Sequence, residues 1–429
     1  MPGNQCKENA FKRLGCRDYE SLKRMRALFV ARHNNDYDSI VPIVDHWART
    51  GNEALIYFPT PQIRWKDDFR TAILRQYSNV RFADLWDMGA HSGLAQWLSQ
   101  QWKTVTPETR AKRKFLQIVT ENALARRYEM GIAAMLDDFR PQVICFDWYS
   151  VPAKRPRFGF YGYQPIMRWA VARAIPTVAL PHGLVLFDPP KGETTNMAMY
   201  SMMFVESEQR RKTLLSSGSE LCEIAVTGSA RYDPTWVEKI AAKLDQLHPA
   251  MQRARHKINI VFFGTKQVYE FDFAEQNRWL IHLSQHPEVE LVIQPHPRGQ
   301  KMSAFAALAG RPNVTIDPKT PATVLISRAD MVSTLTSSVM VEAVLRGREI
   351  LYPKFCNTVV TRFEEKGACI TLEKLEDSHP AIDNYLAGKR VPRENYEAFL
   401  EETAWGGKGP DTIKRICDRL AAMTQGQAG

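Results

Sequence analysis

The amino-acid sequence predicts an α/β protein built from two successive units of doubly wound parallel sheet. Apolar runs of strand length alternate with helical segments, which is the pattern of parallel strands joined by crossover helices. The 429 residues exceed what one ordinary core accommodates and suggest two domains of roughly 200 residues each. The alternation breaks once, at a polar amphipathic helix and a basic link near residues 233–257, and then starts again.

The first half alternates strands with long helical segments. We expect strands at residues 26–33 (RALFVARH), 53–58 (EALIYF), 79–85 (NVRFADL), 142–148 (QVICFDW), 176–180 (PTVAL), 200–207 (YSMMFVES) and 223–229 (EIAVTGS). Helices are expected near residues 38–49, 107–138 and 162–174. This order predicts one mainly parallel sheet for the first domain.

The second half repeats the same alternation. We expect strands in INIVFFGTK (258–266), VELVIQPHPR (289–298), NVTID (313–317), DMVSTLTSS (330–338) and EILYP (349–353), with helices between them. We place the first domain at residues 1–235, with a basic N-terminal extension, and the second at residues 236–380. Polar helices at residues 381–429 are long enough to cross back to the first domain.

Composition restricts the class of protein. Hydrophobic residues make up 44% and charged residues 24% of the chain, as in soluble globular proteins. No apolar run approaches the roughly 20 residues that span a bilayer, and the N-terminus lacks the apolar core of a signal peptide. We therefore expect a cytoplasmic protein, free or peripheral on the inner face of the cytoplasmic membrane. Seven scattered cysteines without a CxxC pair predict reduced thiols, with neither a disulfide framework nor a zinc site.

The net charge of +10 favours an anionic partner: nucleic acid, an anionic membrane surface or a phosphorylated substrate. Nucleic acid is not expected, because the chain has no RNP aromatics, no GXXG clamp and no zinc finger. The basic segment KENAFKRLGCRDYESLKRMR at residues 7–26 fits either a solvated helix or an interfacial membrane segment.

A run of hydroxyls marks the end of one expected strand. Thr336, Ser337 and Ser338 follow a strand that we expect to end near Leu335, and they precede a helix over residues 339–346. Such residues are common N-caps, but hydroxyls between a parallel strand and a helix also form phosphate sites. Glu342, on the first turns of that helix, is either a ribose ligand or a favourable helix charge.

Two histidines follow other expected strands. His182 stands beside Gly183, which allows close approach of a ligand, and imidazole suits acid–base work near neutral pH. His296 lies between two prolines in QPHPRG, followed by Arg298. Because proline fixes φ, this imidazole loses little freedom when it is aimed at a phosphate. A purely structural histidine is the alternative at each position.

Other candidates are weaker. Asp147 ends an apolar strand, so it either caps the next segment or acts as a catalytic carboxylate. Gly228 follows a strand near the interdomain link, where it serves a turn or a ligand. Thr265 follows VFFG, which lacks the GxxxxGK[ST] spacing of a P-loop, and remains a cleft candidate. Asp36 and Asp38 match an Asp-x-Asp metal pattern, but Asp after a strand is commonly an N-cap, and we expect no metal.

Four of these stretches, taken in order, resemble GT-B glycosyltransferases of bacterial surface-polysaccharide synthesis. They are PHG (181–183), VTGSARYD (226–233), QPHPR (294–298) and TSSVMVEAVLRG (336–347). The closest likenesses are the capsule-type Kdo transferases and the CDP-glycerol glycerophosphotransferases that build teichoic acid. The resemblance covers residues 177–353, under half of the chain, and its specificity comes from the order and spacing of short motifs.

The resemblance implies a cleft between two Rossmann-like domains, an acceptor-side N-terminal domain and a C-terminal domain that holds the nucleotide donor. It implies that His296, Ser337 and Ser338 contact the donor phosphate, with Arg298 and Glu342 as neighbours. It also implies that His182 is the base that deprotonates the acceptor hydroxyl. A His-Pro motif together with a Ser-Ser motif recurs in enzymes that use CMP-activated Kdo or sialic acid, which favours a cytidine-nucleotide donor.

The leading hypothesis is therefore a metal-independent GT-B transferase that moves Kdo from a CMP donor to a surface glycan or lipid-linked acceptor in capsule polysaccharide synthesis. His182 and Asp147 would be catalytic, and Thr265 and Gly228 would line the donor site. Leu184 and Val185 follow His-Gly where polyol-phosphate families carry a hydroxyl or small residue and proline, which disfavours a CDP-glycerol-type transferase. A CDP-glycerol-type polyol-phosphate transferase, a UDP-N-acetylglucosamine 2-epimerase-like enzyme and a non-catalytic membrane scaffold remain as alternatives.

Overall fold

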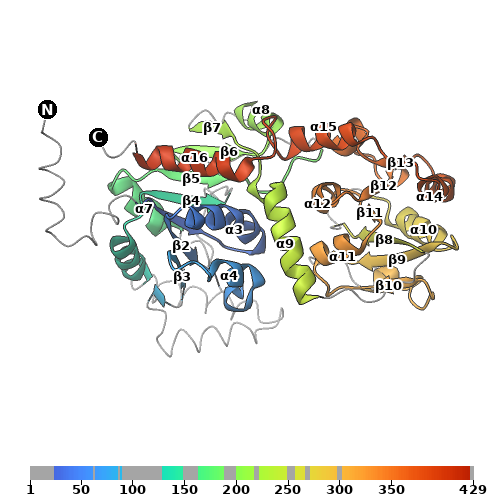
Figure 1. Ribbon diagram of the computed structural model, residues 1–429, viewed down its shortest axis with the longest axis horizontal. Helices are drawn as coiled ribbons and strands as arrows, with labels where there is room; N and C mark the ends of the chain where they lie inside the picture. Colours follow the sequence, from blue (N-terminus) through green and yellow to red (C-terminus); the bar gives the residue numbers. More distant parts are fainter. Residues whose placement is uncertain are drawn as a thin grey trace, which may run out of the picture.

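The computed structural model describes residues 24–60, 63–85, 87–88, 128–147, 163–187, 200–216, 222–248, 257–265, 271–296 and 302–425. Two parallel sheets lie side by side, with helix α9 (Pro234–Leu247) between them (Figure 1). The predicted α/β class with two Rossmann-like domains is confirmed. The basic N-terminal segment lies outside the described residues, apart from its last three.

The first sheet has seven parallel strands in the order β3-β2-β1-β4-β5-β6-β7. The order reverses between β1 and β4, and ligands of doubly wound sheets bind beyond the carboxyl ends of the strands at such a reversal. The strands are β1 (Arg26–Val30), β2 (Glu53–Phe58), β3 (Val80–Asp84), β4 (Val143–Asp147), β5 (Thr177–Leu180), β6 (Met202–Val205) and β7 (Glu223–Val226).

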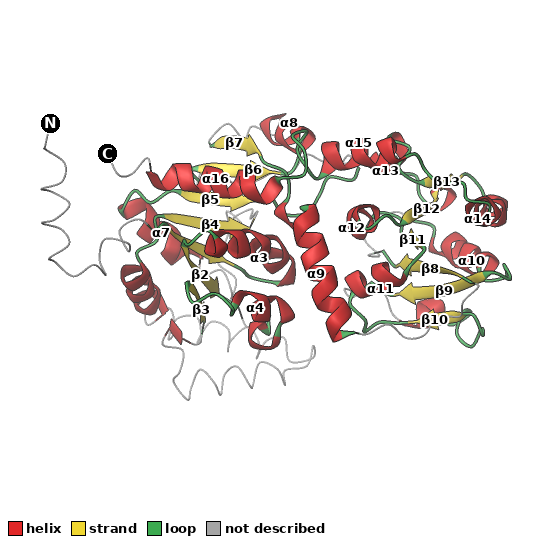
Figure 2. Ribbon diagram, in the orientation of Figure 1, coloured by secondary structure: helices red, strands yellow, loops and turns green. Residues whose placement is uncertain are grey.

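Both faces of this sheet are covered, which explains why its central strands are largely apolar. Ala27 and Phe29 pack in one core with α3 (Asn34–Arg49) and α16 (Thr412–Gln425). Leu28 and Val30 pack in a second core with α7 (Tyr163–Ala172) and the helical residues 128–139. Figure 2 shows these helices around the yellow strands. The rest of the predicted helix over 107–138 lies outside the described residues. Shorter helices are α4 (Phe69–Leu74) and α8 (Glu208–Ser216).

Helix α3 begins at Asn34, earlier than the predicted start near Asp38. The prediction treated Asp36 as a residue of the preceding loop. Instead, the Asp36 carboxylate lies in the first turn of α3 and accepts hydrogen bonds from the backbone N–H groups of Arg32 (2.9 Å) and His33 (3.3 Å). An acid in the first turn stabilises amides that have no partner within the helix, so the helix starts before the DYD stretch.

The second sheet has six parallel strands in the order β10-β9-β8-β11-β12-β13. Its order reverses between β8 and β11. The strands are β8 (Ile258–Phe263), β9 (Val289–Gln294), β10 (Val314–Ile316), β11 (Met331–Ser333), β12 (Glu349–Pro353) and β13 (Ile370–Leu372). The helices are α10 (Phe273–Leu283), α11 (Ala322–Arg328), α12 (Val339–Leu345), α13 (Arg362–Glu365), α14 (Ser378–Leu386) and α15 (Arg393–Thr403).

Three details of the second half differ from the prediction. Strand β11 ends at Ser333 rather than near Leu335, so the hydroxyl loop is longer than expected. The segment between β9 and β10 contains a 3₁₀ turn over Met302–Phe305 in place of an α-helix. Strand β13 was not predicted, because its three residues are too short to give an alternating pattern.

Helix α16 returns to the first sheet and packs on α3. Its buried face carries Ile413, Ile416, Cys417 and Leu420, and the Cys417 thiol lies 3.7 Å from the carbonyl oxygen of Ile43 on α3. The carboxylate of Asp233 accepts a hydrogen bond from the Ile413 amide at 3.2 Å. The C-terminal end of the chain therefore stabilises the first domain.

The described cysteines are free thiols, as predicted: Cys145, Cys356, Cys369 and Cys417 are buried, and Cys222 is half-buried. Within the same described ranges, no helix is both long and apolar enough to cross a membrane.

Candidate active site

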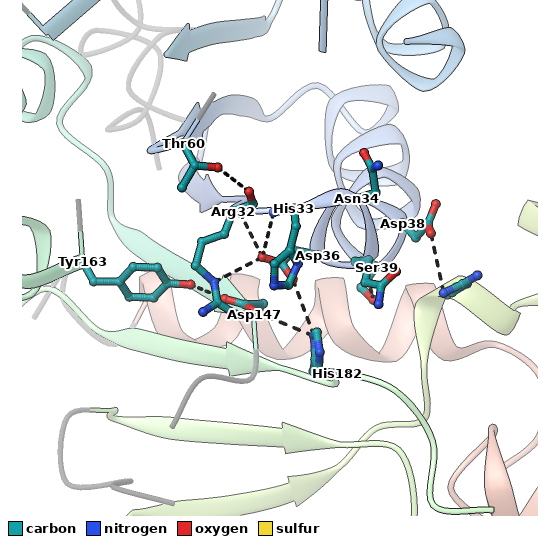
Figure 3. A network of polar contacts seen from close by, with 12 residues as sticks. Arg32, His33, Asn34, Asp36, Asp38, Ser39, Thr60, Asp147, Tyr163 and His182 are labelled. Atoms are coloured by element: carbon teal, nitrogen blue, oxygen red, sulfur yellow. Dashed lines mark hydrogen bonds and ion pairs between the residues drawn. The ribbon is translucent and has the colours of Figure 1, made fainter. Parts of the chain in front are cut away.

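Polar side chains from three neighbouring strands meet at the carboxyl edge of the first sheet, beside its order reversal. Asp147 is the last residue of β4, His182 follows β5, and Arg32 and His33 follow β1 (Figure 3). Asp36 on α3 completes the cluster. Its carboxylate lies 3.6 Å from Nδ1 of His182, and the Asp147 carboxylate lies 3.9 Å from the same nitrogen.

Asp36 is fully buried and is the ionised acid of the cluster. Burial alone would raise its pKa, but the His33 imidazole, 2.6 Å away, and the Arg32 guanidinium, 3.4 Å away, hold the pKa of Asp36 below its ordinary value. Two backbone amides and the first turn of α3 favour the same negative charge. Asp36 therefore remains a carboxylate at neutral pH.

Asp147 is the opposite case. Burial, together with the nearby Asp36 carboxylate, raises the pKa of Asp147 well above its ordinary value. The Arg32 guanidinium and the Tyr163 hydroxyl bind its two oxygens (Figure 3). Because one guanidinium faces two buried acids, Asp147 is the member of the pair whose neutral form is favoured.

His182 is positioned as a neutral base. Its side chain is 31% exposed, and burial of the remainder lowers the pKa of His182 despite the charge of Asp36. The following Gly183 has φ of 76°, and a Cβ there would meet no atom of the described residues within 4 Å, which leaves room for a ligand beside them. A histidine with a lowered pKa beside a carboxyl with a raised pKa is an arrangement that serves acid–base catalysis.

Three donor atoms of this cluster suit a metal ion. Atoms of His33, Asp36 and Asp147 lie within 4.8 Å of one another. However, Arg32 already places a positive charge against both carboxylates, so the charge that a cation would supply is present. Asp38, the second acid of the DYD stretch, belongs to a different network, in which it binds Arg70 and Arg231. The two acids of the motif do not form one ligand pair.

The carboxyl edge of the second sheet carries hydroxyls rather than charges. Thr265 follows β8, Ser333 ends β11 and Thr334 follows it, on either side of the order reversal. In the described part of the chain, the three hydroxyl oxygens are buried and have no hydrogen-bond partner. Buried polar atoms normally have partners, so this edge provides groups that a ligand can satisfy.

Ser337, Ser338 and Glu342 lie beside these hydroxyls. Ser338 occupies the N-cap position of α12 without a side-chain cap bond, and the Ser337 hydroxyl lies 3.4 Å from the Val339 amide. Both serines are half-buried. The Oε1 atom of Glu342 is buried and has no hydrogen-bond partner among the described residues, and burial raises the pKa of Glu342.

Contacts between the domains connect the two edges. Arg231 lies 3.5 Å from Asp38 of the first domain, and its charge also acts on Glu342 of the second. The Tyr232 hydroxyl donates to the carbonyl oxygen of Ser338 at 3.4 Å. Beyond His182, the carbonyl oxygen of Leu186 accepts a hydrogen bond from the Arg362 amide at 2.8 Å. The His182 loop is thus attached to the second domain.

The remaining predicted residues are more scattered. His296 is half-buried just beyond β9, whereas Arg298 lies outside the described residues. Gly228 has φ of 78°, and a Cβ there would come within 2.5 Å of Thr412 and 2.9 Å of the Ala404 carbonyl oxygen. Close packing of the C-terminal segment therefore explains this glycine, and its predicted place in the donor site remains a prediction.

The sequence prediction missed Arg32, His33 and Tyr163 as site residues and considered Asp36 only as a cap or metal ligand. His33 carries the same signal that identified His182, since it follows a buried strand. Tyr163 had no such signal, because it reaches Asp147 from the start of helix α7.

No family model matches the sequence, and no curated protein matches it. Solved structures do match. UDP-GlcNAc 2-epimerase from Methanocaldococcus jannaschii superposes with a TM-score of 0.57 at 14% identity, over 93% of this chain and 100% of that chain. The enzyme from Neisseria meningitidis, bound to UDP-GlcNAc, gives 0.54 at 14% identity over the same shares. The wall teichoic acid polymerase TagF, soaked with CDPG, gives 0.52 at 12% identity over 98% of this chain and 94% of that chain.

The chain has the GT-B fold. The three neighbours match both halves of the chain, and two of them are described with UDP-GlcNAc or CDPG. At 12–14% identity the likeness establishes the fold alone, so chemistry has to be argued from the site residues of this chain.

Proposed function

We propose that this protein is a GT-B glycosyltransferase that moves a sugar, Kdo in the most specific form of the proposal, from a CMP-activated donor to a surface glycan or lipid-linked acceptor. One observation carries the proposal. His182, whose pKa is lowered by burial, lies beside the buried Asp147, whose pKa is raised, at one sheet edge, and the connected edge of the second sheet presents hydroxyls without partners among the described residues.

In this proposal the acceptor hydroxyl lies against His182, which takes its proton as the new bond to the anomeric carbon forms. The bond between the anomeric carbon and the donor phosphate breaks, and the phosphate leaves with the bonding electrons. Ser337, Ser338, His296 and Arg298 bind the phosphate, and Glu342 binds the ribose. Thr265 and Thr334 gain partners in the same step, since ligand oxygens satisfy their hydroxyls.

The positive charge for this chemistry comes from protein groups in our proposal. Arg32 already balances the carboxylates where a divalent ion would otherwise bind. The transfer is therefore proposed to be independent of metal.

Calorimetric titration of CMP, CDP and UDP into wild type and His296→Ala tests the donor site without knowledge of the acceptor. We expect cytidine nucleotides to bind more tightly than UDP, and His296→Ala to weaken that binding by about tenfold or more, the loss of a charge-assisted contact. His286→Ala is a matched control, because His286 lies on the same domain and pairs with Asp383. Absence of cytidine-nucleotide binding, or equal binding in His296→Ala, would contradict the proposal.

A nucleotide-sugar epimerase is the second candidate, because it too needs an acid and a base in one site, which His182 and Asp147 supply. It requires no acceptor. Incubation with UDP-N-acetylglucosamine alone therefore separates the two hypotheses: a new sugar epimer supports the epimerase. If no nucleotide binds at all, neither hypothesis holds, and a scaffolding role in polysaccharide assembly becomes the better interpretation.

A further inference from the structure

Arg231 lies where the two domains meet. It belongs to the 3₁₀ turn η4 (Ala230–Tyr232), which contacts α3 of the first domain and α12 of the second. Its neighbour Tyr232 packs in the core of the second domain, and the Tyr232 hydroxyl donates to the carbonyl oxygen of Ser338, the N-cap residue of α12, at 3.4 Å. The turn that carries Arg231 is therefore fixed against the helix that carries Glu342.

The first domain holds Arg231 through Asp38 of α3 (Figure 3). The Arg231 guanidinium lies 3.5 Å from the Asp38 carboxylate, which also binds Arg70. Arg70 is buried, pairs with Asp68 at 2.6 Å and lies over the ring of Tyr37. Asp38 is thus part of a packed network of the first domain, and this network limits where the Arg231 side chain can lie.

Glu342 of α12 is the acid of the second domain whose charge interacts with that of Arg231. Burial raises the pKa of Glu342, and a hydrogen bond from the Thr323 side chain and the charges of Arg231 and Arg346 oppose that rise. The Oε1 atom of Glu342 is buried and has no hydrogen-bond partner among the described residues. One carboxylate oxygen is therefore left for a ligand that donates a hydrogen bond.

From this arrangement we propose that Arg231 is a positioning residue of the donor site, which holds the Glu342 carboxylate in place to accept hydrogen bonds from a ribose. The inference rests on the proposed function, in which Glu342 binds the ribose, and it specifies the ligand as a ribonucleotide rather than a deoxyribonucleotide. A carboxylate only accepts hydrogen bonds, and a ribose offers it two neighbouring hydroxyls where a 2′-deoxyribose offers one.

A guanidinium suits this role because it can serve two acids at once. It carries five N–H donors in a fixed plane and keeps its charge throughout the physiological pH range. Its two acids, Asp38 and Glu342, lie on different domains. The donor site then includes a residue of the first domain, and it is complete only while the two domains keep this arrangement.

The first test needs no nucleotide. NMR titration of protein labelled with ¹³C at the glutamate carboxyls follows the ionisation of Glu342, and Glu342→Gln assigns its signal. Arg231→Gln should raise the pKa of Glu342 by about one unit, because it removes a charge that favours the carboxylate. Arg311→Gln, a control from the second domain, should leave the titration unchanged, since Arg311 binds the Ser284 hydroxyl instead. An unchanged Glu342 titration in Arg231→Gln would overturn the proposal.

The second test compares CMP with 2′-deoxy-CMP by calorimetry. Wild type should bind CMP at least about tenfold more tightly, the worth of a hydrogen bond to a charged group. Arg231→Gln should reduce this preference to within about threefold, and Arg231→Lys, which keeps the charge, should retain part of it. The ratio of the two affinities isolates the ribose contact, because a general loss of structure weakens both nucleotides alike. The same ratio in wild type and Arg231→Gln would refute the positioning role.

UDP and 2′-deoxy-UDP separate this inference from the proposed function. If wild type does not bind CMP but binds UDP with a ribose preference that Arg231→Gln removes, the cytidine donor is wrong and the role of Arg231 stands. If CMP binds and the ribose preference is absent, or survives in Arg231→Gln, the inference alone is lost. Absence of binding by all four nucleotides would overturn both proposals.

Discussion

The carboxyl edges of the two sheets occupy equivalent positions in equivalent folds, but they differ in whether their buried polar groups have partners within the protein. At the first edge, buried acids are bound by the protein's own groups: Arg32 and Tyr163 on Asp147, backbone amides on Asp36. At the second edge, Thr265, Ser333 and Thr334 have buried hydroxyls without partners in the described residues. The polar groups of the first edge are already paired within the protein, whereas those of the second edge could gain hydrogen bonds from a ligand. This difference fits the proposed function, in which the first edge is catalytic and the second binds the donor.

The largest expected effect is that of His182→Ala on the rate of transfer, because it removes the proposed base at the first edge. Loss of a general base typically costs about 10²–10⁴-fold in rate, and transfer from the CMP-activated donor should fall by that order. Nucleotide binding measured by calorimetry should change little, because the second edge is untouched. If His182→Ala turns over like wild type, the first edge is not the catalytic surface.

Thr334→Val should stabilise the fold but weaken nucleotide binding. Removing a buried hydroxyl that has no partner should raise the free energy of unfolding by about 1 kcal/mol, and it should weaken nucleotide binding. Thr71→Val is the matched control, since the Thr71 hydroxyl lies 2.7 Å from that of Tyr37. This second variant should lose about 1 kcal/mol. Urea denaturation compares them, and a destabilised Thr334→Val would show that the hydroxyl has a structural partner.

The pH dependence of stability should report on His182. Its folded-state pKa lies below the ordinary value of 6.5, so the unfolded chain takes up a proton first as the pH falls. The free energy of unfolding should therefore decrease below about pH 6.5 and reach a plateau above it. His182→Gln should reduce this slope in urea titrations from pH 5 to 8. An unchanged slope would show that the pH dependence of stability comes from other histidines.

Removal of metal should have the smallest effect. If Arg32 supplies the charge at the first edge, treatment with a chelator should leave donor turnover within about twofold of the untreated enzyme. Arg32→Gln should make the enzyme much slower under the same conditions. Loss of activity with the chelator, restored by Mn²⁺, would favour a cation on His33, Asp36 and Asp147 over the guanidinium.

The fold could be predicted from the sequence because the buried strands of both domains are visible as apolar stretches. Buried stretches such as 54–58 (ALIYF) are apolar throughout, and, apart from β13, every observed strand was expected. Helix starts were less predictable: α3 begins early because Asp36 caps amides from inside the first turn, a contact that composition does not reveal.

The site was predictable where a polar residue follows a buried strand. His182 and Asp147 were found in that way and lie together in the structure. Their partners were not, since whether Tyr163 reaches Asp147, or His33 reaches Asp36, depends on how helices and loops pack across the sheet. Position along the chain does not give the distance between residues that far apart.

The return of α16 to the first domain has a mechanical consequence. The chain passes between the domains twice, and the two passages are joined: the Ser229 amide donates to the Ala404 carbonyl oxygen at 2.7 Å, and the Trp405 indole donates to the Tyr232 carbonyl oxygen at 3.0 Å. A body held at two adjacent, bonded points can swing about one axis but cannot rotate freely. We therefore expect any relative motion of the two domains to be restricted to rotation about this double connection, which would return the two unlike edges to the same alignment.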